Sequence, residues 1–176
     1  MNKDLLLSHL RSIPDFPVKG VLFRDVTTLY QDPVCLQEMA TEIASIYLDK
    51  GITKVVGIES RGFILGAVVA DRLGAGFVPI RKPGKLPWDT FSATYMKEYG
   101  PDSVEIHKDA LEPGEVVLIH DDLLATGGTT AAAVELVKRF SPERIYANFV
   151  IELAGEFPDA RKAIPSDVEV STLLKL

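Results

Sequence analysis

The sequence predicts an α/β fold in which a mostly parallel central sheet is flanked by helices. Apolar, β-branched runs that indicate buried strands alternate with amphipathic segments that indicate helices over most of the chain. A small, glycine-rich segment near residue 125 separates a strand from a helix, and ligands of such sheets lie beyond the strands' carboxyl ends. The 176 residues and 47% hydrophobic content fit one domain, residues 1–176, with a substantial core.

Composition limits the function classes. The 25 acidic and 19 basic residues give a formal charge of −6 and argue against general affinity for nucleic acid or anionic membrane. Cys35 is the only cysteine, so the chain has no intrachain disulfide and no Cys/His cluster with the sequence spacing of a zinc site. Neither a signal sequence nor an uncharged apolar run of membrane-spanning length is visible. We therefore expect a soluble, cytoplasmic protein.

The first part of the chain predicts two helices joined by a loop. Spaced leucines indicate a short amphipathic helix over residues 3–12, which nearby prolines end. Prolines and Gly20 then predict a loop that leads into an extended segment at 21–23. Asp32 and Pro33 have the pattern of an N-cap and a first-turn proline, and the covering helix that they begin reaches residue 48.

The middle of the chain predicts a strand, loop and helix unit followed by a lid. Residues 54–58 indicate a buried strand, 63–73 an apolar helix and 77–80 a further strand. Residues 86–109 alternate aromatic, hydroxyl and charged side chains, as in a long β-ribbon or a mobile flap. Downstream, strands are expected over 144–153 and 168–174, with a short helix over 157–164.

The segment VVLIHDDLLATGGTT, which begins at residue 116, carries the strongest functional signal. A strand over 116–119 delivers Asp121 and Asp122 to its carboxyl end, and a helix follows from about residue 131. Between them, the glycine-rich loop offers unpaired backbone N–H groups and a helix dipole, which suit a phosphate. The carboxylates suit vicinal sugar hydroxyls or a divalent cation. His120 is expected either to tune Asp121 or simply to be packed.

Taken separately, an Asp-Asp pair after a strand is often a solvated turn, and Thr-Gly-Gly is often a tight bend. Taken together and in register, the residues predict a site for phosphoribose. The segment resembles the signature of the type I phosphoribosyltransferases. That resemblance implies that the acidic pair holds the ribose 2- and 3-hydroxyls and that the loop holds the 5-phosphate; the loop residues are Ala125, Thr126, Gly127, Gly128 and Thr129.

A second resemblance lies near the amino terminus. The run Pro-Asp-Phe-Pro, followed by Gly-Val-Leu-Phe-Arg-Asp, is similar to the hood of adenine phosphoribosyltransferases, here about residues 13–30. It implies that Phe23 stacks on the purine while the backbone at Leu22 and Arg24 reads the purine edge. Adenine places a donor amine beside an acceptor nitrogen, and 6-oxopurines reverse that edge. Composition alone favours Phe23 as a core residue and Arg24 with Asp25 as a surface ion pair.

Two loops resemble the pyrophosphate-binding segments of the same family. The backbone of Glu59, Ser60 and Arg61 would hold pyrophosphate through a strained peptide between the first two residues, and Arg61 would add charge. Residues 81–87 form the most basic spot in this acidic chain. There Arg81 and Lys85 match positions that contact pyrophosphate, with the arginine reaching across a dimer interface.

The flap completes the resemblance. Glu98 matches the glutamate that exchanges a proton with the purine. Trp88 and Asp89 depart from the residues that the family has at this point of the flap. The resemblance as a whole implies an adenine phosphoribosyltransferase, which is a pentosyltransferase of purine salvage. Such an enzyme makes AMP and pyrophosphate from adenine and phosphoribosyl pyrophosphate. The resemblance also implies a homodimer. Mg²⁺ would be held through the substrate, without a dedicated protein ligand.

Two alternatives remain open. One is a 6-oxopurine phosphoribosyltransferase, which the adenine-type hood disfavours. The other is a non-catalytic regulator that senses phosphoribosyl pyrophosphate and would need a DNA-binding region, whereas no helix-turn-helix segment is visible in the sequence.

Overall fold

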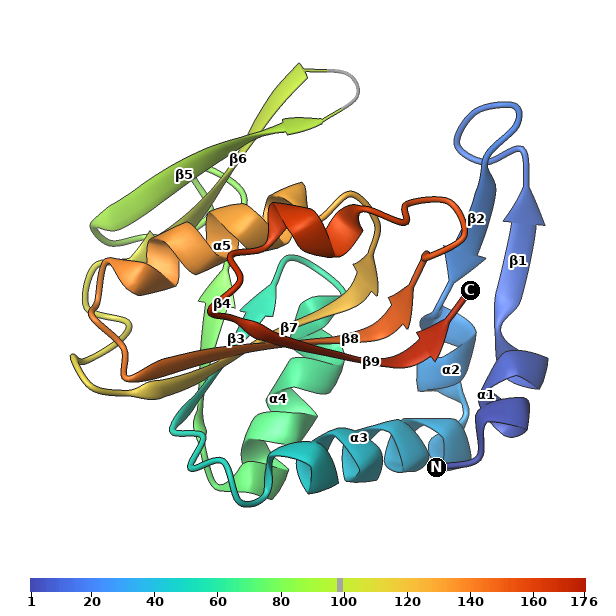
Figure 1. Ribbon diagram of the computed structural model, residues 1–176, viewed down its shortest axis with the longest axis horizontal. Coiled ribbons are helices and arrows are strands. Elements are labelled where there is room, and N and C mark those ends of the chain that lie inside the picture. The colour runs from blue at the N-terminus through green and yellow to red at the C-terminus, as the bar shows by residue number, and fades with distance from the viewer. Residues whose placement is uncertain (98–99) are drawn as a thin grey trace.

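The central element is a five-stranded parallel sheet with the strand order β4-β3-β7-β8-β9 (Figure 1). The computed structural model describes residues 1–97 and 100–176. The strands are β3 (Lys54–Ile58), β4 (Gly76–Ile80), β7 (Val116–Leu124), β8 (Arg144–Glu152) and β9 (Glu169–Lys175). The predicted α/β fold with a mostly parallel sheet is confirmed.

Helices cover both faces of this sheet. Helices α3 (Pro33–Tyr47) and α4 (Gly62–Leu73) share one apolar cluster with α1 (Lys3–His9) and α2 (Thr27–Gln31). Helix α5 (Gly128–Lys138) and the short 3₁₀ helix η1 (Ala160–Ala163) belong to a second cluster on the opposite face. Figure 1 shows α5 above the sheet and α3 and α4 below it. The molecule therefore has three layers.

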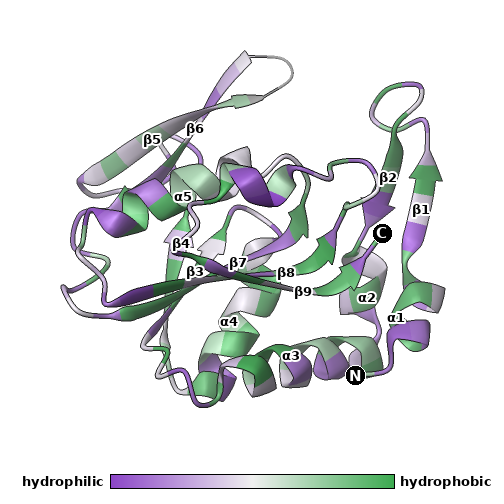
Figure 2. Ribbon diagram, viewed as in Figure 1, coloured by the Kyte–Doolittle hydropathy of each residue, from purple (hydrophilic) through white to green (hydrophobic). Residues whose placement is uncertain are grey.

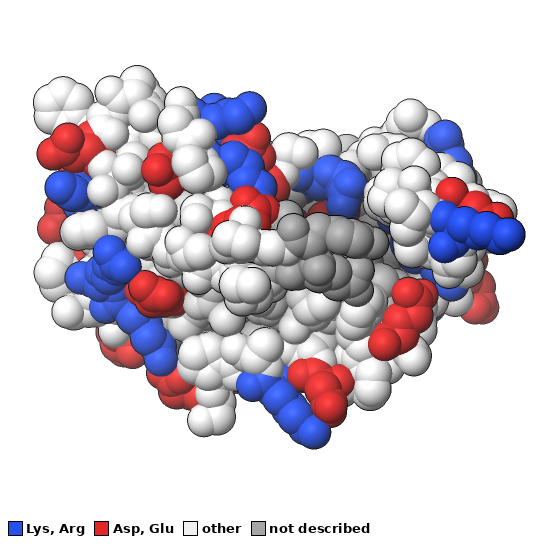
Figure 3. Space-filling model, turned by 90° about the horizontal axis from the view of Figure 1, so that it is seen from above, with Lys and Arg blue, Asp and Glu red and all other residues white. Residues whose placement is uncertain are grey.

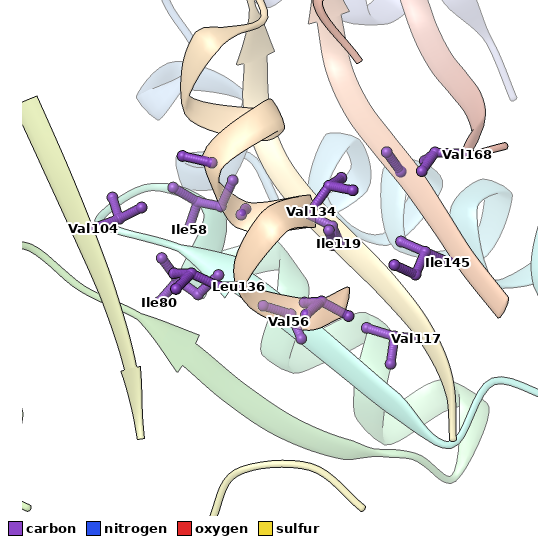
Figure 4. Packing of buried hydrophobic residues seen from close by; sticks show 14 of the residues in the cluster. Val56, Ile58, Ile80, Val104, Val117, Ile119, Val134, Leu136, Ile145 and Val168 are labelled. Carbon is purple, nitrogen blue, oxygen red and sulfur yellow. The ribbon is translucent and has the colours of Figure 1, made fainter. Parts of the chain in front are cut away.

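Each central strand serves both layers, because successive side chains of a strand point to opposite faces. Val55 and Leu118 belong to the α3 and α4 cluster, whereas their neighbours Val56 and Ile119 belong to the α5 cluster. Figure 4 shows side chains of the second cluster, among them Val134 of α5, and Figure 2 shows hydrophobic colour along the strands between the layers. These near-continuous apolar strands are typical of a parallel sheet buried on both faces.

Two antiparallel hairpins complete the fold. Strands β1 (Arg11–Pro14) and β2 (Leu22–Asp25) pair at the amino-terminal end, and β5 (Thr90–Lys97) pairs with β6 (Gly100–His107). The β5-β6 hairpin lies within the segment expected to form a flap. Its buried side chains Ala93, Val104 and Ile106 join the α5 cluster, so the hairpin has an apolar base on the core.

Some predicted boundaries are wrong. Strand β7 continues past Ile119 to Leu124, because its backbone goes on pairing with β8 as far as Glu152. The first helix ends at His9 rather than at residue 12, because the chain there turns into the unpredicted strand β1. Helix α5 begins at Gly128, and the segment expected as a helix over 157–164 contains only a 3₁₀ turn at 160–163. The short helix α2 was not predicted.

Every helix in the described part of the chain is too short or too polar to cross a bilayer.

The cap of helix α3 yields a stability prediction. The Asp32 carboxylate accepts a hydrogen bond of 2.7 Å from the backbone N–H of Cys35, as the predicted N-cap requires. Replacing Asp32 with alanine leaves that N–H without its partner, and we expect a loss of about 1 kcal/mol in the free energy of unfolding. Urea denaturation measures this change, and Asp32→Asn, which keeps a capping oxygen, should recover most of it. Equal losses in both variants would contradict the cap.

Candidate functional site

The sheet order itself locates a crevice. From β3 the chain passes through α4 to β4 on one side, and it later returns as β7 on the other side of β3. Helices α4 and α5 consequently leave the sheet on opposite faces, and the crevice opens between the carboxyl ends of β3 and β7. The loops that leave these ends are residues 59–61 and 125–127. Both were predicted to hold ligand.

At the end of β7, the acidic pair meets the loop after β3. The Arg61 Nε donates to Asp122 Oδ2 at 2.5 Å, and Asp122 is only 3% exposed. The backbone N–H of Asp122 donates to Asp121 Oδ1 at 2.9 Å, and within residues 1–97 and 100–176 Asp121 Oδ2 has no hydrogen-bond partner. A side chain at Gly62 would lie 2.7 Å from the carbonyl oxygen of His120, so glycine permits the close approach of α4 to β7.

Burial and neighbouring charges shift the pKa values of the groups in this cluster. Burial raises the pKa of Asp121 well above its usual value, and the neighbouring Asp122 carboxylate raises it further. Burial alone would lower the pKa of Arg61, but the Asp122 carboxylate outweighs it and the net pKa is raised. Arg61 therefore stays charged, whereas Asp121 holds its proton to a higher pH than an ordinary aspartate. Donors such as sugar hydroxyls, or a cation, would favour its ionised form.

Beside Asp121 lies a small cavity at the amino-terminal end of α5. It encloses about 80 Å³, well above the roughly 10–15 Å³ that one water molecule requires. Its lining residues are Asp121, Leu123, Leu124, Ala125, Thr126, Gly127, Thr129 and Thr130. Because the first helical hydrogen bond of α5 runs from the N–H of Ala131 to the Gly127 carbonyl, the N–H groups before Ala131 are free of intrahelical partners. This arrangement suits an anion the size of phosphate.

Gly127 is sterically required in this loop. Its φ of +83° favours glycine, and a side chain there would collide with the carbonyl oxygen of Ala160. The 3₁₀ helix that contains Ala160 thus presses directly on the loop and helps to fix its path. Of the five predicted phosphate-loop residues, Gly128 alone does not line the cavity, and it instead lies against the β5-β6 hairpin.

The basic loop after β4 is organised by Glu59. The Glu59 carboxylate accepts from Arg81 Nε at 3.3 Å and from the Lys82 backbone N–H at 2.8 Å, and lies 3.8 Å from Lys85 Nζ. Burial raises the pKa of Glu59, but the Lys82 N–H and the Arg81 guanidinium outweigh this effect and the net pKa is lowered. Glu59 is thus ionised and holds the two predicted pyrophosphate-binding cations near the loop that contains Ser60. The peptide bond between Glu59 and Ser60 is cis.

The hood hairpin brings an aromatic ring to the same crevice. The Phe23 ring centroid lies 5.7 Å from the Arg61 guanidinium carbon and 5.1 Å from the Phe16 ring centroid. Leu22 is 37% exposed, and Arg24 donates to the Ser12 hydroxyl at 2.6 Å. The predicted purine-binding residues thus lie on strand β2, with Phe23 next to the acidic pair's arginine partner.

Beneath the acidic pair, His120 is fully buried. Its Nδ1 lies 3.1 Å from Asn148 Oδ1, and its Nε2 has no hydrogen-bond partner in the part of the chain that the structure describes. Burial lowers the pKa of His120 to about 4, so its ring is neutral at physiological pH. A neutral ring supplies no charge with which to tune Asp121.

The sequence did not predict several polar contacts near the site. Lys82 contacts Tyr95 and Asp102 of the hairpin, and these contacts depend on a cross-strand register that sequence patterns do not reveal. The basic run around Lys82 was the only available hint. Glu98, the predicted proton-transfer residue, lies outside the described residues.

Two other features lie away from the crevice. A hollow of about 710 Å³ opens near the amino-terminal end of β8, and its lining includes Lys138 and Arg144 but none of the predicted site residues. His9, Asp32 and Cys35 bring possible metal-ligating atoms within 4.8 Å of one another, a grouping that sequence spacing did not suggest. Asp32 already caps α3 there. Charges on the face in Figure 3 are mixed, without one large basic patch.

Comparison with known proteins relates the chain to phosphoribosyltransferases, as the sequence resemblance implied. The family model described as "Phosphoribosyl transferase domain" matches residues 25–165. A relative from Phocaeicola vulgatus, named adenine phosphoribosyltransferase, is 58% identical over 176 residues, which is 100% of both chains. A relative of the same name from Bacteroides thetaiotaomicron is 57% identical, over 100% of this chain and 99% of its own.

Solved structures of adenine phosphoribosyltransferases have the same fold as this chain. The adenine phosphoribosyltransferase of Rhodothermus marinus has a TM-score of 0.91 and 46% identity, covering 98% of this chain and 97% of its own. The Saccharomyces cerevisiae enzyme, complexed with an iminoaltritol bisphosphate and adenine, has a TM-score of 0.89 and 40% identity, covering 97% of each chain.

Proposed function

This chain belongs to the phosphoribosyltransferase family, and on that premise we propose that it transfers a phosphoribosyl group to adenine. The donor is 5-phosphoribosyl 1-pyrophosphate, and the products are AMP and pyrophosphate. The reaction is that of a pentosyltransferase in purine salvage.

One observation carries the proposal: a phosphate-sized cavity lies directly beside an acidic pair. Asp121 belongs to both features, since it lines the cavity and is paired in sequence with Asp122. A ribose 5-phosphate can therefore place its phosphate among the free N–H groups at the start of α5 while its hydroxyls donate to the carboxylates. The basic loop of Arg81 and Lys85 offers positive charge for a second anion, the pyrophosphate at the anomeric carbon.

The residues then act mainly by positioning and by charge. The bond from the anomeric carbon to the pyrophosphate oxygen breaks as the purine nitrogen attacks that carbon, and the sugar becomes oxocarbenium-like between the two. Arg61, Arg81 and Lys85 stabilise the departing pyrophosphate, and the backbone at Glu59 and Ser60 is assigned to the same group. The hairpin over the site excludes water that would capture the sugar.

The hood supplies adenine selectivity. Phe23 stacks on the purine, and the backbone of Leu22 and Arg24 reads its edge, where a 6-oxopurine would leave buried polar groups unpaired at about 1 to 3 kcal/mol each. Glu98 exchanges a proton with an imidazole nitrogen of the purine.

The oxygen donors of the acidic pair also fit Mg²⁺. Asp121 Oδ2 has no hydrogen-bond partner among the described residues, and hard oxygen ligands suit this cation. Bound through the substrate, Mg²⁺ would neutralise part of the pyrophosphate charge.

The proposal includes a cytoplasmic homodimer. Large apolar side chains are exposed near the pyrophosphate loops, with Ile64 at 47% and Trp88 at 70% exposure, and burial against a second copy would cover them. The substrate is a polyanion that membranes exclude, which supports a cytoplasmic location. Light scattering of the purified chain should give twice the monomer mass, and a monomer would contradict the dimer.

The function is tested by turnover. Purified protein, Mg²⁺ and phosphoribosyl pyrophosphate are mixed with adenine, hypoxanthine or guanine, and nucleotide formation is followed by chromatography. We expect AMP from adenine and at most trace nucleotide from the 6-oxopurines. Preferred use of hypoxanthine would establish a 6-oxopurine enzyme instead, and binding of phosphoribosyl pyrophosphate without turnover would favour a sensing regulator.

A further inference from the structure

A cluster of three polar side chains joins the β5-β6 hairpin to the basic loop. The Lys82 Nζ donates to Asp102 Oδ2 at 2.5 Å and to the Tyr95 hydroxyl at 3.0 Å, and that hydroxyl donates to the same Asp102 oxygen at 3.0 Å. Tyr95 and Asp102 face each other across the hairpin, because they are partners in its register. The two strands thus present one anionic and one hydroxyl group to a single ammonium.

On the basic-loop side, Lys82 is held at both ends. Its backbone N–H donates to Glu59 Oε2, the carboxylate that also anchors Arg81 and Lys85. Its ammonium lies 5.4 Å from the Tyr95 ring centroid, within the range of a cation–π contact. Burial lowers the pKa of Lys82, but the hydrogen bonds with Asp102 and Tyr95 outweigh it and the net pKa is raised. The lysine stays charged and in place.

The other edge of Tyr95 touches the phosphate loop. A methyl group built on Gly128, the first residue of α5, would lie 3.4 Å from Tyr95 Cδ2 and 3.5 Å from the carbonyl oxygen of Met96. The Tyr95 ring therefore stands against the residue that begins the anion-binding helix. Its hydroxyl reaches the lysine of the basic loop at the same time.

We propose that Tyr95 is a positioning residue that sets the separation between the phosphate loop and the basic loop, with Lys82 and Asp102 fixing its hydroxyl end. This inference rests on the proposed function, in which one substrate occupies both loops. Phosphoribosyl pyrophosphate carries its two anionic groups on one ribose ring, so its affinity depends on the spacing of the loops that receive them. Adenine binds at the hood hairpin and does not span the two loops.

The test compares two readouts in Tyr95→Phe, which keeps the ring against Gly128 and removes the hydroxyl. Calorimetry with Mg²⁺ gives the Kd for phosphoribosyl pyrophosphate without adenine, and steady-state kinetics give KM for each substrate. We expect Kd and KM for phosphoribosyl pyrophosphate to rise about tenfold, because the variant loses the hydroxyl's hydrogen bonds with charged Lys82 and Asp102 at a partly buried site, with KM for adenine unchanged. Lys82→Met should also raise Kd, and adding Tyr95→Phe to it should raise Kd less than Tyr95→Phe does in the wild type, because the hydrogen bond from Lys82 is then already absent.

Thr94→Val with Ser103→Ala is the matched control. These residues are the next pair of the same hairpin, their hydroxyl oxygens lie 2.9 Å apart, and they point to the opposite face. We expect their Kd to stay within twofold of the wild type. The positioning role is wrong if Tyr95→Phe leaves Kd unchanged, if the control weakens binding equally, or if the wild type does not bind phosphoribosyl pyrophosphate. Wild-type binding without AMP formation would refute the transferase function alone, since the Kd comparison would still decide the role of Tyr95.

Discussion

Replacing Gly127 with alanine should lower kcat/KM for phosphoribosyl pyrophosphate about a hundredfold, or about 2.7 kcal/mol of transition-state binding. The added methyl group meets the carbonyl oxygen of Ala160, which belongs to another segment and cannot rotate away as a side-chain tip could. Relief of this contact must move the loop that lines the phosphate cavity. Because the proposed phosphate contacts of the N–H groups at the start of α5 depend on their present position, we expect binding and turnover to fall together. Steady-state kinetics measure the change.

Gly114→Ala is the control for this substitution. Gly114 has the same φ of +83° as Gly127, but a side chain there would meet no atom within 4 Å. Both variants therefore carry the strain of alanine in the left-handed region, about 1 to 2 kcal/mol of stability, and only Gly127→Ala carries the steric contact. We expect Gly114→Ala to lose stability and to keep its kcat/KM. Similar kinetics in the two variants would remove the phosphate loop from the mechanism.

Asp121→Asn should lower the activity of the protein and raise its stability without ligand. The amide keeps the oxygen that accepts from the Asp122 N–H but loses the negative charge that favours ribose hydroxyls and Mg²⁺. We expect a loss of about 1 to 3 kcal/mol of transition-state binding, roughly five- to 150-fold in kcat/KM. Without ligand, however, the variant should melt at a higher temperature than the wild type at neutral pH, because it removes an ionisable group whose charged form desolvation and the neighbouring Asp122 carboxylate disfavour.

The sign of the pH dependence follows from the raised pKa. Between the ordinary aspartate value of 3.8 and the higher value of folded Asp121, the folded chain binds more protons than the unfolded chain. The contribution of Asp121 to stability is therefore present below pH 3.8 and is lost as the pH rises through the folded pKa. The stability gain of Asp121→Asn over the wild type should grow over the same range. Calorimetric melting as a function of pH measures it.

Asp167→Asn provides a control of opposite sign. The side-chain hydrogen bond from Lys138 lowers the pKa of Asp167, so its favourable contribution is present above the ordinary value and is lost as the pH falls. The pair is exposed and distant from the crevice, and its removal should leave kcat/KM unchanged without raising the melting temperature. If Asp121→Asn behaves in the same way, Asp121 neither binds substrate nor has a charged form that the folded chain disfavours.

Much of the fold was predictable because it depends on local patterns. The apolar run at 54–58 became β3 with its predicted bounds, and Asp32 with Pro33 began α3 where the cap pattern indicated. The carboxyl end of β7 was not predictable, because Asp121 and Asp122 read locally as the end of a strand. Pairing with β8 gives their backbone groups partners and extends the strand to Leu124. Strand β1 was missed for a similar reason, since only β2 makes it a strand.

In the candidate site, too, local features were predictable from the sequence and contacts between distant segments were not. The sequence alone determined which short segments carry glycine-rich, acidic and basic groups, because each segment is contiguous and its chemistry depends on residue type and spacing. Only the tertiary structure decided which of these groups meet: Arg61 with Asp122, Glu59 with Arg81, and Tyr95 with Lys82. Such pairs join strands, loops and hairpins that are distant in sequence. Their distances are set by sheet order, cross-strand register and packing, which arise only once the whole chain has folded.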